Sequence, residues 1–295
     1  MKKNIFCFML MIYTGVGFAN PNDNPLEELK GDFVLNMGDR PGVPYQQLNN
    51  YNPSLTEAGV GPGYTVSVSR HHIIPRLTLS RFYNRVAELH RLPNLSGFFN
   101  SFSNSLSFYA GSNGVDCGLL GNDLVDAGNL AQAQAFGLAR ASGSNHALGF
   151  DTFEQFYIWL PGNLFIGPRS RSDDPGDDFE LNARTIVGED TYNRLLRAYM
   201  NMVKFLQTND TSLLNSISAD LTTVSKRQSI YSLQSEHWEL KNGEYNIKKP
   251  SVSLKAIPQE ENDSLSEECV DIQPSLINYL YISAFPTRLT GHDEL

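Results

Sequence analysis

Two adjacent histidines at the end of a strand-like run constrain this chain more than any other feature. The run at residues 64–68 leads into His71 and His72, and Pro75 closes the segment. We expect a strand over residues 64–70. Neighbouring side chains on a strand point to opposite faces, so two imidazoles reach one site most easily where the strand ends and the backbone turns. Because the imidazole pKa lies near neutrality, one ring can bind a metal ion while the other accepts a proton.

A distant segment supplies the other polar residues. Residues 159–168 have the sequence WLPGNLFIGP, and an acidic stretch follows at 172–180. The turn-forming Pro-Gly pair favours a second hairpin strand over 163–166. We expect a helix that starts within 179–185 to carry the last part of the site.

The order "HHIIP", "PGNLFIGP" and then acidic residues resembles the HNH, or ββα-metal, nuclease superfamily. In that family a histidine pair opens the motif, an asparagine lies in the following hairpin, and a helix supplies the last ligand. The resemblance covers residues 64–186 and implies an α+β fold, with a small ββα-metal hairpin-helix site embedded in a mainly helical body. The chain departs from the family in two ways. A helical insertion separates the histidines from the asparagine, and no His-x3-His follows the asparagine.

The resemblance implies a role for each of these residues. His71 would be a metal ligand, and His72 would be the general base that activates water. Asn163 would hold the base histidine or the hairpin through its side-chain amide, which both donates and accepts. Because no later histidine pair follows, Asp173 or Asp174 would complete the metal shell.

Other residues of the same region compete for or complete these roles. Glu180 is the competing carboxylate ligand, and a mixed nitrogen and oxygen shell suits Mg²⁺, Mn²⁺ or Zn²⁺ without selecting one. Guanidinium groups bind phosphate well. The expected contacts to a nucleic-acid substrate are Arg70, Arg76, Arg169 and Arg171.

The same residues also have ordinary structural interpretations. Asp173 and Asp174 precede Pro-Gly, which is a favourable turn sequence in which aspartates cap backbone amides. Asn163 also follows Pro-Gly and fits a turn, and a histidine pair at a strand end can be structural. These alternatives remain open at the level of sequence.

The charge distribution gives a mixed indication. The chain has a formal net charge of -9, which disfavours nucleic-acid binding because phosphate contacts need cations. Residues 70–91, however, carry five arginines against one acid, Glu88. This strip lies beside the histidines in sequence, and it also fits the solvated face of an amphipathic helix.

The two ends of the sequence point to export. Residues 1–19 have a positive start, an apolar centre and a small-residue ending, which is typical of a secretory signal peptide. No later segment is long and apolar enough to predict a transmembrane helix. Residues 292–295 are HDEL, the address that the KDEL/HDEL receptor reads to return proteins to the endoplasmic reticulum. Together they suggest a secreted toxin that uses a host secretory route, although a eukaryotic lumenal protein or a chance polar tail fits as well.

The cysteines and the composition shifts divide the chain further. Cys117 and Cys269 remain after the signal peptide, and two cysteines in an exported protein favour one disulfide. Sequence alone does not place their Cα atoms within bonding reach. The expected organisation is a signal peptide at 1–19, an irregular segment at 20–63, an HNH-like domain at 64–206 and a C-terminal helical and hairpin region at 207–295.

Apolar periodicity predicts most of the remaining elements. The Asp151-x-x-Glu154 spacing resembles a capping box at the start of one of the helices. Residues 94–126 are rich in serine, glycine and asparagine and give no clear pattern. The expected helices are 78–91, 127–140, 151–160, 189–206, 210–222 and 272–284, with a hairpin over 237–247 and an acidic linker over 259–268.

The sequence thus favours a secreted, metal-dependent HNH-like endonuclease that acts as a toxin. One alternative is a secreted toxin of another class, such as an ADP-ribosyltransferase, although the Arg … Ser-Thr-Ser … Glu-x-Glu series of that class is not evident. The other alternative is a non-catalytic lumenal or secreted binding protein. The sequence does not distinguish DNA from RNA as the substrate.

Overall fold

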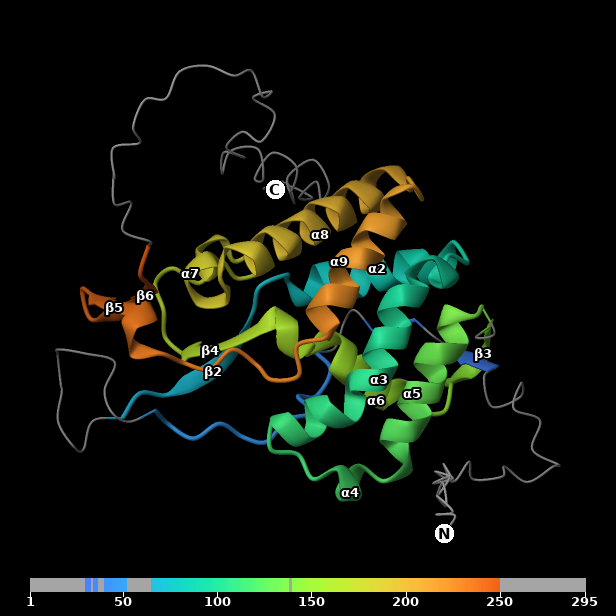
Figure 1. The fold of residues 1–295 in the computed structure, drawn as a ribbon, viewed down its shortest axis with the longest axis horizontal. Coiled ribbons are helices and arrows are strands. Elements are labelled where there is room, and N and C mark those ends of the chain that lie inside the picture. Colours follow the sequence, from blue (N-terminus) through green and yellow to red (C-terminus); the bar gives the residue numbers. More distant parts are fainter. Residues whose placement is uncertain (1–29, 33, 37–39, 52–64, 138–139, 250–295) are drawn as a thin grey trace, which may run out of the picture.

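The computed structural model describes residues 30–32, 34–36, 40–51, 65–137 and 140–249 (Figure 1). Helices make up most of this part, and its strands form three two-stranded sheets. The α+β class expected from the sequence is therefore confirmed. The expected signal peptide, acidic linker, last helix, HDEL tail and Cys269 lie outside the described residues.

The central two-stranded antiparallel sheet, called the hairpin below, joins two segments that are far apart in sequence. Strand β2 (Val68–His72) pairs antiparallel with β4 (Leu164–Pro168), so that His71 lies opposite Phe165 and His72 opposite Leu164. The predicted boundary of 64–70 was therefore wrong, because the strand includes both histidines. The reason is the position of β4, whose ladder continues past His72 through a hydrogen bond from Ile73 N to Asn163 O of 3.0 Å.

The helical body contains one long helix that the sequence did not reveal. α3 (Ser96–Ser112) occupies the pattern-poor region, and three of its four phenylalanines are buried. Packing of these aromatic side chains outweighs the weak helix propensity of serine, glycine and asparagine. The body also contains α2 (Arg76–Glu88), η1 (Leu92–Leu95), α4 (Cys117–Leu120), α5 (Asn122–Ala135) and α6 (Phe150–Ile158).

The predicted capping box at α6 was wrong. α6 begins after Gly149, which has a φ of 75° and makes no side-chain cap. A side chain at this position would collide with the backbone of α5, so glycine is required there. Asp151 lies 2.9 Å from Nδ1 of His146 instead, and Glu154 accepts a hydrogen bond from Asn36 N.

The C-terminal part of the described chain follows the sequence closely. α8 (Glu189–Thr208) confirms the clearest predicted helix, and α9 (Leu213–Ser225) lies near its expected position. The hairpin of β5 (Trp238–Lys241) and β6 (Glu244–Ile247) is confirmed. Its two turn residues both have positive φ, as a tight hairpin turn requires. The remaining elements are β1 (Lys30–Asp32), β3 (Arg140–His146), η2 (Pro161–Asn163), η3 (Leu181–Ala183), α7 (Arg184–Val187) and η4 (Ser235–His237).

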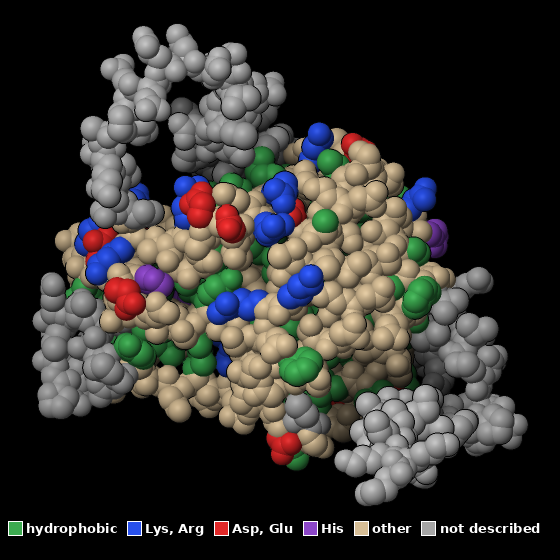
Figure 2. Space-filling model, viewed as in Figure 1, with side chains coloured by type: hydrophobic (Ala, Val, Ile, Leu, Met, Phe, Trp, Pro, Cys, Tyr) green, Lys and Arg blue, Asp and Glu red, His purple; other side chains and the backbone are tan. Residues whose placement is uncertain are grey.

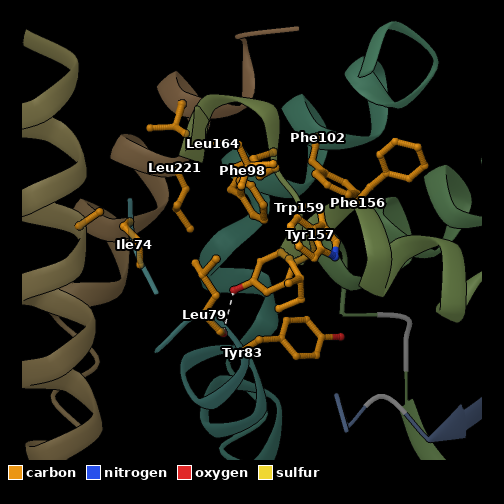
Figure 3. Packing of buried hydrophobic residues seen from close by; sticks show 14 of the residues in the cluster. Ile74, Leu79, Tyr83, Phe98, Phe102, Phe156, Tyr157, Trp159, Leu164 and Leu221 are labelled. Carbon is orange, nitrogen blue, oxygen red and sulfur yellow. Dashed lines mark hydrogen bonds between the residues drawn. The ribbon is translucent and has the colours of Figure 1, made fainter. Parts of the chain in front are cut away.

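One continuous apolar core runs from Leu35 to Ile247 and supports the central hairpin. Aromatic rings from α3 and α6 fill its middle (Figure 3), and the Tyr157 hydroxyl donates to Leu79 O at 3.1 Å. Trp159 follows α6 directly, and its ring nitrogen donates to Pro41 O. The core therefore fixes the end of α6 against both the hairpin and the N-terminal segment. No helix in the described ranges is long and apolar enough to cross a membrane.

Candidate functional site

A cleft of about 310 Å³ opens beside the paired ends of β2 and β4. Its volume is at the lower end of the range typical of small-ligand sites. Its lining contains eight of the residues that the sequence singled out. Its lining includes Arg40, Ser69, Arg70, His71, His72, Arg76, Arg169, Arg171, Asp174, Asp177 and Glu180.

Asn163 fixes the backbone that follows the histidines. Its side chain is 1% exposed, accepts a hydrogen bond from Ile74 N at 2.7 Å and donates one to Ile74 O at 2.9 Å. The amide thus pairs with Ile74 as a neighbouring strand would. Asn163 therefore holds the hairpin, because both of these side-chain hydrogen bonds go to Ile74 and not to His72.

The hydrogen bonding of His72 determines which nitrogen carries its proton. Nε2 lies 3.0 Å from Ile158 O, a carbonyl that can only accept, so Nε2 carries the hydrogen. The other nitrogen, Nδ1, has no hydrogen-bond partner within the described ranges and keeps its lone pair. The pKa of His72 is lowered to about 3, mainly by burial and also by Arg40 and Arg76, while the hydrogen bond to Ile158 O acts in the opposite direction. His72 is accordingly neutral near pH 7.

His71 has the complementary arrangement. Its Nε2 lies 3.0 Å from Pro168 O, which leaves the lone pair on Nδ1. Nδ1 is 3.5 Å from Oδ2 of Asp174, and the histidine side chain is only 9% exposed. Burial and the nearby Arg171 lower the pKa of His71, whereas Asp174 raises it. The ring also stacks on Phe165, so its direction is fixed.

The geometry of His71 and Asp174 fits two ligands of one divalent ion. Two ligands at about 2.1 Å from a metal lie roughly 3.0–3.5 Å from each other, close to the observed separation. The hydrogen bond from Nε2 to a backbone carbonyl is the usual support for a metal-binding histidine. Among the described residues no group of three or more possible ligand side chains was found. Mg²⁺ usually keeps several water ligands, so two protein ligands are enough to suit it.

Three of the expected site residues have structural roles instead. Asp173 Oδ1 lies 3.0 Å from Arg171 Nε, and its Oδ2 accepts from Ile247 N and Asn182 Nδ2, so it does not contribute to the candidate metal site. Glu180, the competing ligand, is 1% exposed and forms a 2.8 Å ion pair with Arg171. The Arg171 side chain is fully buried between these two acids, so it is not placed to bind phosphate. These three predictions are corrected by the same buried ion network.

The other predicted arginines reach the cleft, and one further arginine joins them. Arg70 donates to Gln46 O at 2.6 Å and lies over the ring of Tyr45. Arg76 is the first residue of α2, while the exposed Arg169 follows β4 and has no side-chain hydrogen bond or ion pair within the described part of the chain. Arg40 was missed by sequence reasoning, and its guanidinium lies 4.7 Å from the ring centre of Trp159.

The arginine excess in the cleft is local. Basic and acidic side chains are interspersed over the face shown in Figure 2, and the whole chain is acidic. The lining of the cleft has five arginines and three acids, and because Arg171 and Glu180 pair with each other, four arginines remain against two acids. Such a concentration of guanidinium groups favours an anionic ligand.

Comparison with known proteins gives one relative. The chain is 31% identical over 212 residues to "Putative protein p9" of Acyrthosiphon pisum secondary endosymbiont phage 1, which covers 65% of this chain. The match covers 52% of the relative, so the chain spans about half of that protein. No family model matches, and no solved structure matches. The name of the relative states no activity.

Proposed function

We propose that the chain is a secreted metal-dependent endonuclease of the HNH type, which hydrolyses phosphodiester bonds in nucleic acid. The single observation that supports this best is a cleft lined by arginines, by the His71–Asp174 pair and by His72, whose Nδ1 keeps its lone pair. Hydrolysis needs a base for water and positive charge for the phosphate, and the cleft offers both.

His72 acts as the general base. Its Nε2–H continues to donate to Ile158 O, and Nδ1 takes a proton from the attacking water. A pKa near 3 keeps the ring neutral but makes it a weak base. A phosphate anion that enters the cleft offsets the effect of Arg40 and Arg76 and raises this pKa, because a nearby anion favours the imidazolium. Substrate binding therefore strengthens the base at the moment it is needed.

His71 and Asp174 hold the divalent ion, which when bound neutralises charge on the phosphate and on the leaving oxygen. Asp174 is fixed by a hydrogen bond from Gly176 N to its Oδ1 at 2.9 Å, which leaves Oδ2 turned to His71. Arg40, Arg76 and Arg169 bind phosphate oxygens, and Asn163 keeps the backbone of the hairpin in register.

The test is cleavage of plasmid DNA and of RNA by the purified protein with Mg²⁺, Mn²⁺ or Zn²⁺. His72→Ala should lower the cleavage rate by at least 100-fold, since general-base catalysis contributes on the order of 10²–10⁴. The matched control is His90→Asn, which removes an exposed imidazole outside the cleft and tolerates the φ of 55° at that position.

Two results would count against the assignment. Wild-type protein that cleaves neither polymer with any of the three ions would refute it. Equal cleavage rates for wild type and His72→Ala would show that His72 is not the general base. Loss of metal binding in His71→Ala, measured by calorimetry, separates the ligand role from the base role.

We also propose where the protein acts in the cell. The signal-like residues 1–19 and the HDEL ending at 292–295 suggest a toxin that is retrieved through a host secretory route by the KDEL/HDEL receptor. Deletion of Leu295 should then lower toxicity to eukaryotic cells while cleavage of purified substrate stays unchanged. Equal toxicity at matched uptake would show that the tail is not used.

A further inference from the structure

A second hollow of about 480 Å³ lies next to the cleft and shares Arg169 with it. It is called the groove here. Its floor is made by three buried residues, Val66, Pro168 and Tyr245, and its rim by three exposed hydroxyl residues, Thr65, Ser67 and Ser170. The groove therefore combines an apolar base with hydrogen-bonding edges, whereas the cleft is strongly charged.

The groove lies at the opposite end of the β2–β4 hairpin from the histidines. Arg169 N donates to Ser67 O at 2.8 Å, one step beyond the pairing of Val68 with Pro168. Ser67 precedes His71 by four residues, which corresponds to roughly 13 Å along a strand. This distance is longer than one phosphate group, so a ligand that reaches from Ser67 to the histidines must extend well beyond a single phosphate. A ligand that fills both hollows must be a chain.

We propose that the groove binds nucleotides that flank the scissile phosphate, so that the enzyme acts on an extended nucleic-acid strand. This inference rests on the proposed nuclease function and specifies its substrate. The apolar floor suits the faces of bases, and the hydroxyl groups of the rim suit base edges or sugar oxygens. Arg169 borders both hollows with its guanidinium exposed, and it contacts the phosphate that passes between them.

The continuity of the two hollows favours this occupant over others. A small phosphate ester is satisfied by the cleft alone and leaves the groove unused. A strand of nucleic acid repeats anionic and flat apolar groups along its length, which matches a basic cleft followed by an apolar groove.

Blocking the groove tests the proposal. Ser67→Trp and Ser170→Trp each place a large ring on an exposed rim position, and the matched control is Ser112→Trp at the end of α3, which borders neither hollow. The probes are fluorescein-labelled oligo(dT) and oligo(U) of about 12 nucleotides, a length within known single-strand site sizes. We expect the Kd from fluorescence anisotropy to rise about 5- to 100-fold in both rim variants, as for the loss of one stacked base. Ser112→Trp should bind as the wild type does.

A small diester separates this proposal from the nuclease assignment. Bis(p-nitrophenyl) phosphate occupies only the cleft, so its hydrolysis should be equal in wild type and both rim variants. If the rim variants bind oligonucleotides as tightly as wild type does, the groove proposal is wrong even when the diester is hydrolysed. If the rim variants bind more weakly but the wild type hydrolyses neither the diester nor the oligonucleotides, the groove stands and the nuclease assignment fails.

Discussion

Replacement of Asn163 by alanine should destabilise the protein by roughly 3 kcal/mol. The change removes both partners of the Ile74 backbone, whose N–H and C=O lie 2.7 Å and 2.9 Å from the Asn163 side chain. Ile74 is 0% exposed, so water does not replace the lost bonds. An unpaired buried polar group costs about 1–3 kcal/mol, and two groups are left here, which gives about 2–6 kcal/mol before the backbone relaxes. The lower half of that range is expected because the segment joins β2 to α2 and can shift.

Urea unfolding followed by circular dichroism measures this loss. With a slope of about 3 kcal/mol/M for a chain of this size, the midpoint should fall by roughly 1 M. The control is Asn193→Ala, which removes an exposed asparagine on α8 that bonds to Glu189 one turn away and should change stability by less than about 0.5 kcal/mol. A loss below about 1 kcal/mol in Asn163→Ala would refute the argument that this side chain replaces a missing strand.

Asn163→Asp gives an independent check of the same geometry. The aspartate still accepts from Ile74 N but has no donor for Ile74 O unless it is protonated. Burial against a carbonyl oxygen favours the protonated acid, so the pKa of the new carboxyl should be raised in the folded state. Its stabilising effect is then present at low pH and lost as pH rises through that pKa. A variant that becomes relatively more stable towards neutral pH would contradict the hydrogen-bond assignment.

Two further predictions concern His72, the proposed base, and Arg40, the arginine that sequence reasoning missed. The pKa of His72 is about 3 in the folded protein and about 6.5 in the unfolded chain, so the unfolded chain binds the extra proton. The free energy of unfolding should therefore fall as pH drops from about 6.5 towards 3, by on the order of 3–4 kcal/mol in all. His72→Gln should flatten this pH dependence in urea titrations, and an equal pH dependence in both proteins would show that the ring is not desolvated. If Arg40 contacts phosphate, Arg40→Ala should reduce the slope of log Kd against log salt for single-stranded DNA by about 0.7, while Arg91→Ala, which removes an exposed arginine outside the cleft, should leave the slope unchanged.

Elements with strong local patterns were predictable from the sequence. The apolar stripe of α8 and the Asn-Gly turn of the β5–β6 hairpin each specify a structure within a few residues. α3 has no such signal, because its polar residues are weak helix formers. Its buried rings gain stability only when they pack against α5 and α6, which are distant in sequence. The length of β2 also depended on a distant partner, since β4 determines where its ladder ends.

The candidate site was likewise predictable from the sequence only in part. The sequence identified His71, His72 and Asp174, and the structure brings them to one cleft because β2 and the segment after β4 lie side by side. Arg40 was not predictable. It belongs to a segment without regular structure, and that segment is held near the site by a hydrogen bond between Trp159 and Pro41, residues 118 positions apart.

The choice between the adjacent acids Asp173 and Asp174 follows from the energetics of Arg171. A fully buried guanidinium needs carboxylate partners, and removal of one partner from a buried pair costs about 3–5 kcal/mol. Asp173 and Glu180 are therefore committed to Arg171, and moving either towards a metal would leave that charge uncompensated. Asp174 has no such obligation, since its side chain is exposed and one oxygen already faces His71. The ion network of Arg171 thus excludes Asp173 and Glu180 as metal ligands, and it also anchors the loop that carries Asp174. Substitution of Arg171 should therefore move Asp174 away from His71, although neither of these two residues is changed.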